Sequence, residues 1–115
     1  MEECIFCKIA RGEIPVLTVY SDDLVMAFDD ISPQAPVHTL IIPRQHFENF
    51  GDDIPMDVFA ALCAAVPKVA EIKGVTDSGY RIIINNGPDA RQSVPHLHLH
   101  LVGGAPMSHK MVDVL

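Results

Sequence analysis

The chain has 115 residues, of which 49% are hydrophobic and 20% are charged, and its formal net charge is −7 at pH 7. This balance predicts one globular domain, residues 1–115, with enough apolar side chains for a core of its own. The acidic charge argues against nucleic-acid binding, which needs a basic face, but a local pocket of imidazole and amide donors still suits one phosphate group.

The sequence gives no sign of a targeting or membrane segment. Residues 1–4 lack the basic start and apolar run of a signal peptide. The longest apolar run, Val58 to Val66, is too short to span a bilayer. We therefore expect a cytoplasmic protein with reduced thiols and no membrane partner.

The first half of the chain predicts a short helix and three strands. Residues 4–10 are compact and apolar, and Gly12 is expected to close the helix. Residues 16–20 and 24–28 predict a hairpin with a turn at 21–23. Prolines and polar residues make 29–36 a loop, and residues 39–42 form a buried strand that Pro43 ends.

The longest predicted element is a helix over residues 56–72. Asp52 and Asp53 are candidate caps, Pro55 suits the first turn, and Gly74 is the expected stop. Inside the helix, Pro67 should introduce a kink.

Cys63 lies in the same helix and is expected to fill the core, because a free cysteine packs as a small hydrophobic residue. Residues 80–84 predict another strand, which the Asn-Asn-Gly-Pro turn at 85–88 ends. Residues 89–95 then form a loop.

Three histidines alternate with leucines in residues 96–101. This period of two predicts a strand over 96–102, with the imidazoles on one face and the leucines on the other. A half-buried strand with a polar outer face explains one such histidine better than three. The functional interpretation is a row of bases or nucleophiles that act near neutral pH.

The expected order is helix, three strands, long helix and two strands, joined by short connections that favour antiparallel pairing. This order predicts an α+β domain with one five-stranded antiparallel sheet, one long helix and one short helix.

The histidine row suits two kinds of chemistry. Three imidazoles on one flat strand converge on a catalytic zinc only with strain, so a metallohydrolase is an alternative. In the favoured interpretation the central His98 attacks phosphorus, and its neighbours stabilise charge on the phosphate oxygens. Ser93, just before the row, is placed to assist the leaving group.

Residues 96–102 match the signature His-x-His-x-His-x-x with apolar x, and the chain here resembles the histidine triad (HIT) family. It is closest to the Hint branch in Ile5-Phe6-Cys7-Lys8-Ile9, Asp30-Ile31-Ser32-Pro33-Gln34-Ala35-Pro36-Val37-His38, Ile42-Pro43-Arg44-Gln45-His46 and Gln92-Ser93-Val94-Pro95. The resemblance implies a HIT fold and a homodimer whose two sheets join into one. It also implies hydrolysis or transfer at the α-phosphate of purine nucleoside phosphoramidates or aminoacyl-adenylates, through a covalent nucleotidyl-histidine. A nucleotide-binding regulatory module with little turnover is the alternative function.

The resemblance implies roles for individual residues. His98 corresponds to the nucleophile, His100 to a phosphate contact, and His38 to the histidine that extends the hydrogen-bond network behind the nucleophile. Asp30 corresponds to the carboxylate that holds the ribose hydroxyls. The residues implied near the phosphate and leaving group are Asn85 and Ser93, and Gln92 is a further implied nucleotide-binding residue. Those of an apolar slot for the base are Ile5, Phe6, Ile9, Ile14 and Ile31.

Some of these residues also have structural interpretations. Asp30 can cap the loop, Phe6 and Ile9 can be plain core, and Asn85 can be a turn residue. The chain departs from the branch pattern at Arg91, where many relatives have glycine, and a charged side chain there suits contact with phosphate or leaving group. The tail, residues 105–115, contains no Trp; tails in this family help to choose the leaving group.

Cys4 and Cys7 have the two-residue spacing of half a zinc site, with a redox pair or unliganded thiols as alternatives. The resemblance to HIT proteins, and to the related galactose-1-phosphate uridylyltransferases, implies His46 and His96 as the other two ligands. A structural Zn²⁺ there would fasten the N-terminal segment to the sheet, and no organic cofactor is expected.

Overall fold

The computed structural model describes residues 4–115. The first three residues of the expected domain, including most of the start that argues against a signal peptide, lie outside the described residues. The elements are α1 (Ile5–Ala10), β1 (Thr18–Ser21), β2 (Val25–Asp29), β3 (Val37–Pro43), α2 (Met56–Ile72), β4 (Tyr80–Ile84) and β5 (Leu99–Gly103). Their order confirms the predicted α+β class.

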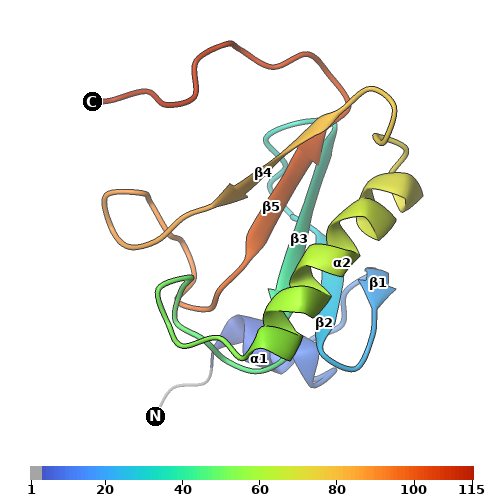
Figure 1. The fold of residues 1–115 in the computed structure, drawn as a ribbon, viewed down its shortest axis with the longest axis vertical. Helices are drawn as coiled ribbons and strands as arrows, with labels where there is room; N and C mark the ends of the chain where they lie inside the picture. Colours follow the sequence, from blue (N-terminus) through green and yellow to red (C-terminus); the bar gives the residue numbers. More distant parts are fainter. Residues whose placement is uncertain (1–3) are drawn as a thin grey trace.

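The strands form one antiparallel sheet in the order β1-β2-β3-β5-β4 (Figure 1). Strand β5, the last in sequence, lies between β3 and β4. Within it His100 pairs with Leu40 of β3 on one side and with Ile83 of β4 on the other. The histidine segment therefore leads into the interior of the sheet rather than to an edge.

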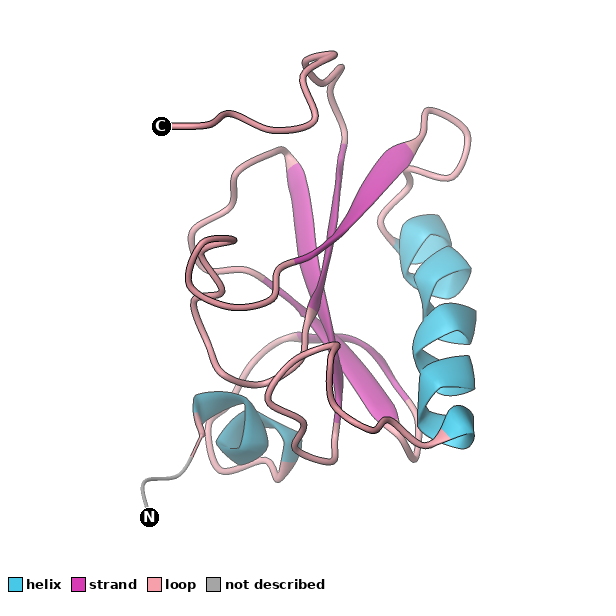
Figure 2. Cartoon of the chain, turned by 60° about the vertical axis from the view of Figure 1, so that its left-hand side comes forward, coloured by secondary structure: helices cyan, strands magenta, loops and turns pink. Residues whose placement is uncertain are grey.

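The two helices of residues 4–115 cover opposite faces of the sheet (Figure 2). On the α2 face the leucines of the histidine row pack with residues of the helix such as Leu62 and Val69. On the α1 face Phe6 and Ile9 pack against strands β2 and β3. The period-two alternation thus separates leucines from imidazoles as predicted. Each large apolar side chain buried in these two layers contributes about 1.5–3 kcal/mol.

The predicted strand over residues 96–102 is shorter in the structure, because β5 begins only at Leu99. In the antiparallel register Pro43 would face Leu97, and a proline has no N–H to continue the ladder. The Leu97 N–H instead donates to the Phe47 carbonyl at 2.7 Å. His96 and His98 therefore sit on an extended lead-in, outside the strand.

The hairpin and the short helix lie close to their predicted positions. The Asp22 carboxylate accepts the N–H groups of Leu24 and Val25, each at 2.9 Å, and so shapes the turn between β1 and β2. After α1, Gly12 adopts a φ of 77° and donates its N–H to Ile9, which ends the helix as predicted.

Helix α2 begins at Met56 with Pro55 as its N-cap, and no side chain caps it. The expected cap at Asp52 is wrong: its carboxylate accepts the Glu48 N–H at 2.7 Å in the preceding loop. Asp53 likewise precedes the cap position. The helix continues through Pro67 to Ile72.

Cys63 is exposed, so its predicted place in the core is wrong. Leu62, Ala65 and Val69 face the sheet, and one helical residue turns the side chain by about 100°. Cys63 follows Leu62 and therefore points to solvent. Within residues 4–115, no helix combines the length and hydropathy needed to cross a membrane.

Candidate active site and metal centre

A pocket of about 360 Å³ lies between α1 and the imidazole face of the sheet. It has an apolar wall and a polar end that includes Asp30, Ser93, His98 and His100. All five residues predicted for a base slot line it: Ile5, Phe6, Ile9, Ile14 and Ile31. An apolar slot with convergent polar groups at one end suits a nucleoside with its phosphate.

Phe6 belongs both to the core and to this pocket. Its ring contacts His98 edge-on, with centroids 5.2 Å apart, and His96 at 5.8 Å. Ile9 likewise belongs to the core and lines the pocket, so both residues lie where a core role and the predicted slot role meet. Sequence reasoning missed further lining residues from β2 and β3, Phe28 and Leu40, because alternation does not tell which helix covers which face.

His98 is buried, and one of its ring nitrogens is fixed by the backbone. Its Nδ1 lies 2.7 Å from the carbonyl oxygen of His96. A carbonyl oxygen only accepts, so the proton of the ring is on Nδ1. The lone pair is then on Nε2, where it can act as a base or a nucleophile.

His100 receives its orientation from a chain of hydrogen bonds. The Gln34 N–H donates to His38 Nδ1 at 3.0 Å, so His38 carries its proton on Nε2. That Nε2–H donates to His100 Nδ1 at 2.8 Å. His100 therefore presents its own Nε2–H as a donor, beside the His98 ring at 4.9 Å between centroids. The Gln34 amide was missed because a backbone group leaves no signal in the residue type.

Burial keeps His100 uncharged. Desolvation, reinforced by the neighbouring His98 and His38, lowers the pKa of His100 to about 4, although Asp30 opposes the shift. At neutral pH the residue is thus a hydrogen-bond donor without a formal charge, placed against the polar end of the slot.

Asp30 shapes its loop and also lines the pocket. One carboxylate oxygen accepts the Ser32 N–H at 2.8 Å and shapes the loop. The other lies 3.7 Å from His38 Nε2, and the residue lines the slot. The loop function therefore leaves the carboxylate at the pocket.

The three polar residues Asn85, Gln92 and Ser93, predicted to bind the nucleotide, take different positions. Ser93 lines the slot, and Asn85 lines an adjoining pocket of about 190 Å³ that includes His38 and His100. Gln92 supports the loop instead: its amide donates to the carbonyls of Glu48 and Val94 and accepts the Gly87 N–H.

A second cluster gathers Cys4, Cys7, His46 and His96, whose ligand atoms all lie within 4.8 Å of one another. Cys4 Sγ is 3.3 Å from His96 Nδ1, and Cys7 Sγ is 3.3 Å from His46 Nδ1. Tetrahedral zinc with sulfur and nitrogen ligands requires donor atoms about 3.5 Å apart. The four residues therefore fit a structural zinc ion.

The orientation of His96 favours the same interpretation. Its Nε2 lies 2.9 Å from the Pro43 carbonyl and so carries the proton, which leaves the Nδ1 lone pair toward the thiols. Burial lowers the pKa of His96 to about 4, so the ring is in its ligand form at neutral pH. Among residues 4–115 the other potential ligand cluster is Asp30, His38 and His100, and neither cluster unites the three histidines of the row.

Comparison with known proteins decides the family. The model of the HIT domain matches residues 11–107. The chain belongs to the HIT domain family. It is 45% identical over 108 residues to the purine nucleoside phosphoramidase of Escherichia coli K12, covering 92% of this chain and 91% of the relative.

Two further relatives of this HIT-domain chain extend the comparison. The 14 kDa zinc-binding protein of Brassica juncea is 44% identical over 110 residues, which is 92% of this chain and 96% of that protein. A solved structure of a HIT family hydrolase from Clostridium thermocellum superposes with a TM-score of 0.92 at 43% identity, covering 97% of this chain and 99% of that one.

Proposed function

We propose that this HIT-domain chain hydrolyses nucleoside 5′-phosphoramidates at the α-phosphate, with His98 as the nucleophile. The observation that carries the proposal is the fixed proton on His98 Nδ1, which leaves Nε2 as the attacking atom beside the apolar slot. The similarity to a purine nucleoside phosphoramidase supports the substrate class and a purine base.

The reaction has two steps. In the first, the lone pair of His98 Nε2 forms a bond to phosphorus while the phosphorus–nitrogen bond to the leaving amine breaks. The leaving nitrogen takes a proton, for which the Ser93 hydroxyl is the placed donor. In the second, water attacks phosphorus, gives a proton back to the Ser93 oxygen and displaces His98, which yields the nucleoside 5′-monophosphate and restores both side chains.

The other polar residues bind and orient. The Nε2–H of His100 donates to a non-bridging phosphate oxygen, where negative charge is held through both steps. Asp30 at the slot accepts from the ribose hydroxyls. The hydrogen bonds that run from Gln34 through His38 hold the His100 ring in place, so its N–H donor needs little reorientation during the reaction.

Turnover of adenosine 5′-phosphoramidate tests the proposal, together with a rapid acid-free quench that traps adenylylated His98. We expect hydrolysis to AMP and a label on His98. Tight nucleotide binding with negligible turnover would instead support the regulatory module. Activity that is lost with a chelator within the time of one assay and restored by zinc would support the metallohydrolase.

For the second cluster we propose a structural Zn²⁺ held by Cys4, Cys7, His46 and His96. Bound there, it would tie α1 to the lead-in of β5 and so fix the slot wall. Zinc binding needs both cysteines reduced, so the proposed site fits a reducing, cytoplasmic location. Metal analysis of protein purified without chelator should give one zinc per chain, and an unchanged zinc content in Cys4→Ala would refute the site.

We also propose a homodimer in which two sheets join through β4. This edge strand exposes Ile82 and Ile83, at 37% and 40% of their surface, and its pairing with β5 is regular. The opposite edge, β1, has an irregular register between Thr18 and Tyr20, which makes it a poorer partner. Sedimentation should give a dimer at micromolar concentration, and a monomer would refute the proposal.

A further inference from the structure

The turn before Ser93 holds an arginine in an unusual backbone conformation. Arg91 has a φ of 61°, and no other non-glycine residue of 4–115 has a positive φ. This left-handed region is unfavourable for a residue with a Cβ atom. The turn therefore imposes this conformation against the backbone preference of arginine.

Hydrogen bonds at both ends of the turn explain how it is imposed. The Arg91 N–H donates to the Pro88 carbonyl at 3.0 Å. The Gln92 N–H donates to the Gly87 carbonyl at 3.1 Å, and the Gln92 side chain accepts the Gly87 N–H. With the turn closed in this way, the Cα–Cβ bond of Arg91 leaves the turn in a defined direction.

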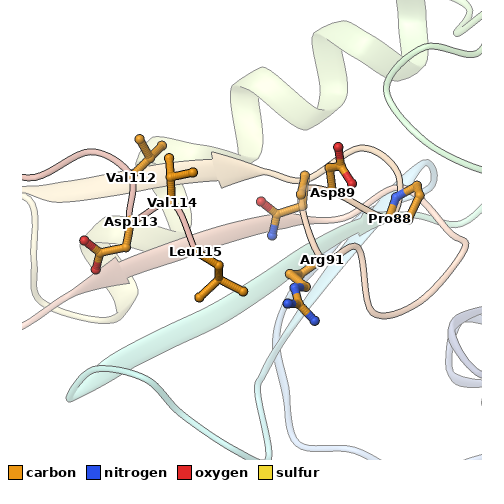
Figure 3. Close-up of a pocket in the computed structure, with 9 residues that line it drawn as sticks. Pro88, Asp89, Arg91, Val112, Asp113, Val114 and Leu115 are labelled. Atoms are coloured by element: carbon orange, nitrogen blue, oxygen red, sulfur yellow. The ribbon is translucent and has the colours of Figure 1, made fainter.

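That direction leads to a pocket of about 730 Å³ between the turn and the C-terminal segment. Figure 3 shows Arg91 and Leu115 among the side chains that line this pocket. Asn85 lines this pocket and also the smaller pocket that contains His100. The surface is therefore continuous from the base slot, past the phosphate position at His100, to Arg91.

Arg91 is the only cation among the residues that line this pocket. Two carboxylates, Asp89 and Asp113, line it as well, but both are turned away from the guanidinium in Figure 3. None of the ion pairs found within residues 4–115 includes Arg91. Its donors are available to a ligand, in a chain that is otherwise strongly acidic.

We propose that Arg91 determines leaving-group specificity by binding an anionic group, a carboxylate or a phosphate, on the amine that departs. The inference rests on the proposed phosphoramidate hydrolysis, because that reaction places a leaving group beyond His100. A guanidinium binds either anion through two parallel hydrogen bonds. Apolar side chains of the tail, Val112, Val114 and Leu115, would contact the carbon skeleton between the amine and the anion.

Three matched substrates test the inference: adenosine 5′-phosphoramidates of propylamine, β-alanine and 2-aminoethyl phosphate. The variant is Arg91→Asn, because asparagine tolerates the left-handed conformation and removes the guanidinium from the pocket. We expect kcat/KM to fall about tenfold for at least one anionic substrate and less than twofold for the propylamine compound. The substrate that responds identifies the anion as carboxylate or phosphate.

Lys68→Gln is the charge-matched control, since it removes one exposed cation from α2 on the other face of the sheet. It should leave all three rates unchanged. A fall of equal size on the neutral and anionic substrates, or no fall on either anion, overturns the proposal. If the wild type hydrolyses none of the three, the proposed function fails as well, whereas turnover of the propylamine compound alone preserves that function and rejects the anion site.

Discussion

His96 and His98 are two residues apart, and each uses a different ring nitrogen for its hydrogen bond to a backbone carbonyl. In His96 a carbonyl oxygen engages Nε2, which leaves Nδ1 toward two thiols. In His98 a carbonyl oxygen engages Nδ1, which leaves Nε2 at the pocket between α1 and the sheet. Under our two proposals the same side chain is a metal ligand in one place and a nucleophile in the other, according to which ring nitrogen the backbone carbonyl engages.

The two sites are also joined. The carbonyl that holds His98 belongs to His96, and the Phe6 ring contacts both imidazoles. Phe6 lies on α1 between the two cysteines of the metal cluster. The proposed metal site and the proposed catalytic site therefore share the Phe6 ring and the His96 backbone but use different ring nitrogens, so substitutions should separate their effects.

The largest expected effect is on catalysis alone. His98→Asn keeps an N–H toward the His96 carbonyl but has no nucleophilic lone pair. We expect kcat to fall about 10⁴-fold or more, with zinc content unchanged. Steady-state rates and metal analysis of the same preparation measure both, and His109→Asn in the exposed tail is the control. Residual activity within tenfold of the wild type would contradict the nucleophile assignment.

The next effect is on stability. Cys7→Ala removes one thiolate from the metal cluster, and we expect unfolding free energy to fall by about 3 kcal/mol, with Tm lower by roughly 10 °C. Because His96 still holds His98, kcat should stay within about tenfold. Thermal melts measure the loss, and Cys63→Ala, an exposed thiol on α2, is the matched control. Equal Tm values for the two variants would argue against a structural metal.

A smaller effect concerns pH, through His100. Burial lowers its pKa to about 4, whereas an unfolded histidine titrates near 6.5. Between these two pKa values the unfolded chain binds more protons than the folded chain. The free energy of unfolding therefore falls as pH falls from about 6.5 to about 4, and His100 adds no pH dependence to it above that range. We expect His100→Gln to flatten this decline by roughly 1–3 kcal/mol in urea unfolding at stepwise pH. Parallel curves for wild type and variant would contradict the assignment.

Local patterns predicted more of the molecule than contacts between distant segments did. The alternation of His98 and Leu99 placed them on opposite faces because side-chain period is a local property. The start of β5 was not predictable, since it depends on the missing N–H of Pro43 across the sheet. Cys63 was misplaced because apolar residues surround it on all sides of the helix, so periodicity there is weak.

The candidate site likewise has features that the residue types predict and features that they do not. Residue type marked His98, His100 and the cysteines, and resemblance supplied their partners. The Gln34 N–H and the Pro43 carbonyl set two of the tautomers, yet both are backbone groups that any residue carries. Their direction depends on loop conformation, which composition does not specify.

The smallest expected effect is on stability and concerns the strained backbone at Arg91. Arg91→Gly should raise the free energy of unfolding by about 1 kcal/mol, because glycine adopts a φ of 61° without the Cβ clash. Ala90→Gly, one residue earlier and without positive φ, should lower stability instead. Urea unfolding of both variants measures the difference. A stabilised Arg91→Gly that also loses the anionic substrates would mean that the guanidinium is kept at the cost of stability, whereas a destabilised one would mean that Arg91 holds the turn together.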